Sequence, residues 1–126
     1  MVITKENYVD HAEQVMRKLC DNGSRQKDLV TTSKIRSILS MVSEIYNNVR
    51  LERDPKLNEN LKERLQYLKM RMVYEAGREP SVKTFIEEAR LMKVLDEVGD
   101  SRERLITFCH YMEALVAYRK FLGGDK

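Results

Sequence analysis

Few side chains in this sequence could act as nucleophiles or metal ligands, and their spacing keeps them apart. The histidines are His11 and His110, and the cysteines are Cys20 and Cys109. His11 has no second ligand one helical turn away, and Cys109 and His110 are neighbours that diverge by about 100° on a helix. A metal-dependent hydrolase needs converging histidines or carboxylates, and a nucleotide site usually needs a glycine-rich phosphate loop. We therefore predict no catalytic residue, no metal site and no cofactor.

Basic side chains are the remaining candidates, because lysine and arginine bind the phosphates of nucleic acids. One flank of an expected helix over residues 33–50 carries basic and polar side chains without a carboxylate: Arg36, Ser43, Asn47 and Arg50. Lys34 lies on the other flank, in the first turn, where a positive charge opposes the helix dipole. The sequence leaves two interpretations of this helix open, an anion-binding surface and an ordinary solvated face.

A second line of side chains combines arginine with tyrosine in the next expected helix. Spacings of three, four and three residues place its members one above another: Arg64, Tyr67, Arg71 and Tyr74. Alternating arginine and tyrosine suits a phosphate backbone with exposed bases. Alternatively, the tyrosines border the core and the arginines cover them with their aliphatic stems. Arg78 follows in a turn directly after Gly77, where backbone amides are also free.

The elements that position these residues are predicted to be helices. The 126 residues are 42% hydrophobic and 34% charged, with five glycines, two prolines and a formal net charge of +3. Apolar residues recur at three- and four-residue spacing between capping residues and glycine stops. We predict an all-α fold, a single-domain bundle over residues 1–126. Its five helices are expected at residues 5–20, 33–50, 56–76, 80–96 and 102–121.

The C-terminal helix is predicted to lie at the centre of this bundle. It is apolar on nearly every side, which indicates burial among other helices. Glu113 interrupts that apolar surface, and if it is buried it must be paired or hydrogen-bonded. In the helix expected at 80–96, Leu91, Val94 and Leu95 lie outside the inward-facing stripe. They either meet another subunit or widen the core.

A secretion signal or membrane-spanning segments in the sequence would indicate where the protein is located. The start of the chain lacks the basic-then-apolar order of a signal peptide, and no apolar run reaches membrane-spanning length. The two cysteines lack the spacing of metal ligands. We predict a cytoplasmic protein with no membrane partner.

Four segments resemble one known family, the small subunit of type III-A CRISPR interference (Csm) complexes. The most specific are LVTTSKIRSILSMVSEIYN at residues 29–47 and YMEALVAYRKFLGG at residues 111–124. Between them, LQYLKMRMVYEAGRE and VKTFIEEARL are also similar to that family. The resemblance extends from about Thr4 to Gly124 and follows the family's order.

The resemblance implies a five-helix bundle that is not catalytic. Copies of it would stack beside the backbone subunits and line the channel for the duplex of guide RNA and target RNA. The expected partners are therefore both RNAs, other subunits and further copies of the chain. The family's segments carry over five basic residues as RNA contacts: Lys34, Arg36, Arg78, Arg119 and Lys120. The two lines described above add three more: Arg50, Arg64 and Arg71.

Two rival functions come from different classes. A helical protein-interaction module would dock other subunits through exposed apolar residues and would not contact RNA directly. A small metal-dependent nuclease would require a ligand cluster that the sequence lacks. Salt-dependent RNA binding separates the first rival from the RNA-contacting subunit.

Overall fold

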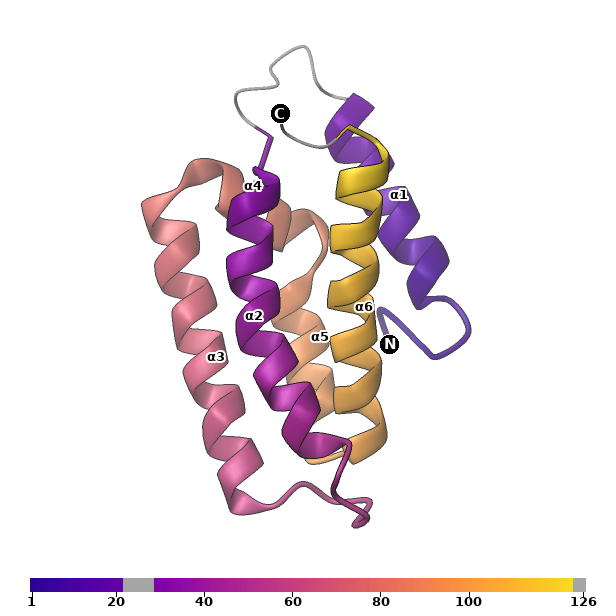
Figure 1. Ribbon diagram of the computed structural model, residues 1–126, viewed down its shortest axis with the longest axis vertical. Helices are drawn as coiled ribbons and strands as arrows, with labels where there is room; N and C mark the ends of the chain where they lie inside the picture. The colour runs from indigo at the N-terminus through magenta and orange to yellow at the C-terminus, as the bar shows by residue number, and fades with distance from the viewer. Residues whose placement is uncertain (22–28, 124–126) are drawn as a thin grey trace.

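The chain folds as a bundle of helices in the computed structural model, which describes residues 1–21 and 29–123. Six helices occur in these residues: α1 (Tyr8–Asp21), α2 (Thr32–Val49), α3 (Glu59–Arg78), α4 (Pro80–Glu88), α5 (Leu91–Val98) and α6 (Arg102–Phe121). Helices α3 and α1 lie at opposite sides of the bundle, with α2 and α6 between them (Figure 1). Helix α6 packs against α1, α2 and α5. The predictions of an all-α bundle and of a central C-terminal helix are confirmed.

The helix predicted at residues 80–96 is two helices, which corrects the predicted number from five to six. Arg90 adopts the left-handed conformation, with φ 55° and ψ 39°, between α4 and α5. Its amide donates to the carbonyl of Glu87 at 3.1 Å, which closes the last turn of α4. The turn redirects α5 so that Leu91, Val94 and Leu95 are all buried. These three residues therefore widen the core.

Two helices begin later than predicted. The first starts at Tyr8, because Thr4 to Asn7 form a turn in which the Thr4 amide donates to Asn7 Oδ1 at 2.7 Å. The third starts at Glu59, and its N-cap is Asn58, whose Oδ1 accepts from the amide of Leu61 at 2.9 Å.

The segment before α3, predicted to be helical from residue 56, instead pairs with the segment before α6. The amide of Leu57 donates to the carbonyl of Asp100 at 2.8 Å. The amide of Arg102 donates to the carbonyl of Pro55 at 3.0 Å. These two hydrogen bonds join the starts of α3 and α6.

The core is built around one face of α6. The residues predicted for that face are all buried: Leu105, Phe108, Cys109, Met112, Leu115 and Val116. Tyr111 is also buried, and its hydroxyl donates to the carbonyl of Ala89 at 2.9 Å. Glu113 is exposed, so the pairing expected of a buried carboxylate does not arise. Within the described residues, no helix has the length and apolar character required to cross a membrane.

Candidate nucleic-acid interface

The most open basic surface lies along α2 and is called here the α2 basic flank: Arg36, Ser43, Asn47 and Arg50. All four are exposed. Within the part of the chain that the structure describes, the side chains of Arg36 and Arg50 form no ion pair or hydrogen bond. Arg36 and the C-cap residue Arg50 are fourteen positions apart, which corresponds to about 21 Å along the helix axis. Hydroxyl and amide groups stand between them, so the flank offers donors to phosphate along its whole length.

Lys34 begins the same helix, but its charge is already paired. Its ammonium nitrogen lies 2.7 Å from Glu79 Oε2, at the turn between α3 and α4. The hydrogen bond and the charge of Lys34 lower the pKa of the Glu79 carboxyl below its usual value. Sequence patterns do not show this contact, because 45 positions separate the two residues in the chain. An RNA phosphate would have to compete with Glu79 for Lys34.

The arginines of α3 form a row at seven-residue spacing, called here the arginine edge: Arg64, Arg71 and Arg78. Glu75 lies 3.5 Å from Arg71 and 3.6 Å from Arg78, so one carboxylate serves two guanidinium groups. Both guanidinium groups also lie over the ring of Tyr74, at 5.1 Å and 5.8 Å from its centroid. Arg64 is exposed and has no ion-pair partner among the described residues.

The tyrosines of α3 are more than half exposed. Tyr67 is 59% exposed and Tyr74 is 51% exposed. Tyr67 nevertheless lines the hollow between α2 and α3 together with the buried residues Ile45 and Leu68. The arginines do cover Tyr74, but they do so at the surface. Sequence reasoning also missed Met70 and Val73, which are 55% and 57% exposed on the same helix.

The two basic surfaces lie on opposite flanks of α2. Met41 and Ile45 of α2 face α3, because they line a hollow of about 310 Å³ together with Arg64 and Tyr67. On the other flank, the ring of Tyr46 lies 5.4 Å from that of His110 in α6. Arg50 follows Tyr46 by four residues, so the α2 basic flank lies toward α6. The surfaces do not merge into one continuous patch.

Two adjacent basic residues in the last turn of α6 have different environments. Lys120 is exposed, and its side chain has no partner among the described residues. Arg119 is buried, with 3% of its surface exposed. Its Nε donates to the carbonyl of Val30 at 2.9 Å, and Nη1 donates to that of Gly123. Arg119 thus joins the end of α6 to the segment before α2, and its burial argues against a direct contact with RNA.

The histidines lie among aromatic rings of α1, α2 and α6, and Cys109 is buried. His110 lies between the rings of Tyr8 and Tyr46, and burial lowers the pKa of His11, with a further contribution from the charge of Arg90. Burial raises the pKa of the Cys109 thiol to about 12, so it is protonated at neutral pH. Across residues 1–21 and 29–123, no group of three potential ligands could hold a metal ion.

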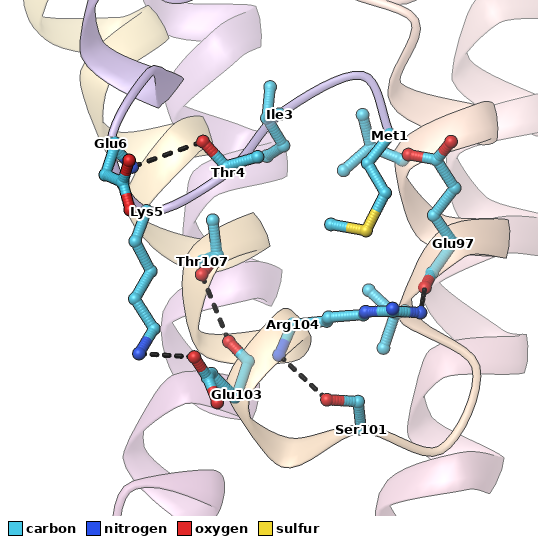
Figure 2. A pocket seen from close by; sticks show the side chains of 12 residues that line it. Met1, Ile3, Thr4, Lys5, Glu6, Glu97, Ser101, Glu103, Arg104 and Thr107 are labelled. Atoms are coloured by element: carbon cyan, nitrogen blue, oxygen red, sulfur yellow. Dashed lines mark hydrogen bonds and ion pairs between the residues drawn. The ribbon is translucent and has the colours of Figure 1, made fainter.

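A pocket of about 570 Å³ lies between the N-terminal segment and the turn from α5 to α6. In Figure 2, Lys5 reaches the carboxylate of Glu103, and the guanidinium group of Arg104 reaches the backbone of Glu97. Lys5 pairs with Glu103, and Arg104 Nη1 donates to the carbonyl of Glu97 at 3.1 Å. The carboxylate of Glu97 accepts from the amide of Val2 at 2.9 Å. The contacts of Lys5 and Val2 hold the N-terminal segment on the bundle.

Comparisons with known proteins identify relatives along nearly the whole chain. The family described as Csm2 Type III-A matches residues 4–125. A CRISPR system Cms protein Csm2 from Streptococcus thermophilus is 44% identical over 123 residues, which cover 98% of this chain and 97% of the relative. The protein of the same name from Mycobacterium tuberculosis (strain ATCC 25618 / H37Rv) is 41% identical over 122 residues, covering 97% and 96%. That of Enterococcus italicus is 36% identical over 121 residues, covering 91% and 86%.

Proposed function

The chain belongs to the Csm2 Type III-A family, and from this premise we propose that it is a non-catalytic subunit of a type III-A CRISPR effector complex. Its relatives are named as proteins of a CRISPR system, and the chain spans nearly their full length. In that complex the chain would stack in several copies and line the channel for the duplex of guide RNA and target RNA. The absence of a three-ligand group from the described residues supports a structural role.

The α2 basic flank is the proposed RNA contact. The observation that carries this proposal is the pair of exposed arginines, Arg36 and Arg50, on a flank of α2 that contains no carboxylate. Neither guanidinium is engaged within the described part of the chain, so phosphate binding would not have to break an existing ion pair. Lys120 is a further candidate, because Arg119 holds the end of α6 beside Val30, close to the start of α2.

Such contacts would recognise shape and charge and would not read bases. Phosphate contacts position a protein on a nucleic acid without carrying sequence information directly. In RNA-guided effectors, pairing between guide and target reads the sequence. A flank of arginine, serine and asparagine side chains suits that division, because it accepts any guide.

Photo-crosslinking within the assembled complex tests the position of the RNA. A photoreactive phenylalanine analogue replaces Ser43, which lies midway between the two arginines, and in a control variant it replaces Asp10 on the outer surface of α1. We expect RNA crosslinks from position 43 and none from position 10. If position 43 gives no RNA crosslink in an assembled complex, the α2 basic flank is not the RNA contact.

A second candidate function, protein interaction without direct RNA contact, is favoured by a different observation. Half of the exposed large hydrophobic side chains in the described residues lie on α3. The two functions occupy different surfaces and are compatible. The crosslinking experiment separates them, because a pure interaction module gives protein crosslinks only.

A further inference from the structure

The outer surface of α3 is unusually apolar for a helix that faces solvent. Four of its large hydrophobic side chains are more than half exposed: Tyr67, Met70, Val73 and Tyr74. Elsewhere in the described residues, exposed large hydrophobics are isolated from one another: Met1, Val9, Leu51 and Phe121. Isolated exposed apolar residues are ordinary, whereas a contiguous group marks an interaction surface.

The spacing on α3 is that of a helix that packs against another helix. Tyr67, Met70, Tyr74 and Gly77 follow one another at intervals of three, four and three residues, and they are called here the outer seam. This is the alternation of the apolar positions in a coiled coil. The buried residues Leu61, Leu68 and Met72 lie on the opposite side of α3 and already contact the core. The outer seam is therefore a second packing surface, and nothing in the described chain covers it.

Gly77 adds an independent observation. It lies in the last turn of α3 with an ordinary helical φ, and a Cβ built on it would have no atom within 4 Å. A glycine inside a helix costs about 0.5–1 kcal/mol relative to alanine. Neither a positive φ nor a close approach within the chain explains that cost. A partner helix that approaches closely at the outer seam explains it.

The charges beside the outer seam indicate what the partner carries. The arginine edge runs along one side of the seam with three positive charges, and Glu44 and Glu63 line the hollow beside Arg64. Arg71 and Arg78 share the single carboxylate of Glu75, which leaves one unit of positive charge between these two guanidinium groups. Tyrosine, methionine and arginine are also the residues enriched at protein interfaces. A partner with carboxylates along the matching side complements this edge.

A second copy of the chain does not meet that requirement. In a symmetric pair of antiparallel α3 helices, the same edge of each helix meets its copy, so the arginines would face arginines. No other helix in the described residues presents a group of exposed large hydrophobics. These two observations favour a different chain as the partner.

We infer that the outer seam of α3 docks a helix of a different subunit, whose apolar seam has carboxylates along the side that meets the arginine edge. This inference rests on the proposed function, in which the chain is one subunit of a larger complex. The arginines of α3 then serve protein docking, while those of α2 serve RNA.

Competitive assembly tests the docking surface with two variants. Gly77→Leu places a bulky side chain on the outer seam, where the chain itself leaves open space, so the isolated variant should fold and melt no lower than the wild type. Phe121→Leu, at an isolated exposed residue, is the matched control. Each tagged variant competes with the untagged wild-type chain during reconstitution of the complex.

We expect Gly77→Leu to be incorporated at least tenfold less than the wild type, and Phe121→Leu to be incorporated equally. Equal incorporation of Gly77→Leu would overturn the inference. Assembly at the normal level with weakened target-RNA binding would also overturn it, because the surface would then bind RNA. The proposed RNA contact is tested by a different variant. If Arg36→Ala/Arg50→Ala leaves RNA binding unchanged, the proposed function is contradicted, whatever the result for Gly77→Leu.

A zero-length crosslink tests the chemistry of the partner. Arg71→Lys/Glu75→Gln supplies an amine at the arginine edge and removes the carboxylate beside it within the chain. A carbodiimide joins an amine only to a carboxylate that it touches. In the assembled complex we expect a link from position 71 to an aspartate or glutamate of a different subunit. A link to a second copy of this chain, or no link between chains, would contradict the assignment of the partner.

Discussion

Replacing Arg119 by methionine separates a structural arginine from an RNA-binding one. Methionine keeps much of the apolar stem of the arginine side chain and removes the guanidinium group. That group donates from Nε to the carbonyl of Val30 at 2.9 Å, across 89 positions of sequence, and both residues are buried. The substitution leaves the carbonyl of Val30 without this donor and away from water.

The expected loss of stability follows from this bond and from the second one, to the carbonyl of Gly123. A hydrogen bond with a charged donor contributes roughly 1.5–3 kcal/mol to folding, and a buried acceptor left unsatisfied costs a similar amount. We therefore expect Arg119→Met to lower the free energy of unfolding by about 2–3 kcal/mol. For a chain of this length, each kcal/mol shifts the melting temperature by about 3–4 °C. The variant should melt roughly 6–12 °C below the wild type.

Thermal unfolding followed by circular dichroism measures this shift, and Lys120→Met is the matched control. The neighbouring lysine is exposed, so its substitution should change the free energy of unfolding by less than about 0.5 kcal/mol. If Arg119→Met melts with the wild type while the salt dependence of RNA binding falls, Arg119 contacts RNA. The buried arrangement described here would then be refuted.

Three further outcomes are expected. Arg90→Gly should raise the melting temperature, because glycine adopts φ 55° without the steric cost of about 1 kcal/mol that a side chain incurs; a lower value would show that the Arg90 side chain stabilises the turn. The pKa of His11 is lowered in the folded state, so the unfolded state binds more protons below pH 6.5 and stability should fall as the pH drops from 7 to 5. His11→Gln should melt with a smaller pH dependence, and an unchanged dependence would assign it to other groups. The purified chain should not cleave labelled RNA or DNA with Mg²⁺ or Mn²⁺, and cleavage that co-elutes with it and is lost with chelator would contradict a structural role.

Much of the fold could be predicted because helical periodicity is a local property. The apolar residues of α6 recur at intervals of three and four, and that spacing determines which side is buried. The break at Arg90 has no such signal, since the sequence there contains neither glycine nor proline. At Asp54-Pro55, a capping residue before proline predicts a helix start, but distant backbone groups of Asp100 and Arg102 pair with that segment instead.

The candidate site could be predicted only where single helices decide exposure. Arg36 and Arg50 were correctly placed off the apolar stripe of α2, because their spacing separates them from its buried residues. Lys34, on the other flank of the same helix, is also a predicted RNA contact, yet its charge is paired with Glu79 in a contact between distant segments. Arg119 lies at helical spacing from Met112 and Val116, and this signal of burial was present in the sequence. The three- and four-residue spacing of the outer seam is likewise visible in the sequence, but only the structure shows that its side chains are exposed.

The salt dependence of target-RNA binding to the assembled complex tests the central claim most directly. Arg36→Ala/Arg50→Ala removes both charges of the α2 basic flank, and Arg64→Ala/Arg71→Ala removes two charges of the arginine edge. Each lost phosphate contact should reduce the slope of log affinity against log salt by roughly 0.7–0.9. We predict a reduction of about 1.4–1.8 per bound copy for the first pair, with the melting temperature preserved, and no reduction for the second. An unchanged slope for Arg36→Ala/Arg50→Ala in a folded, assembled complex would contradict RNA binding by α2.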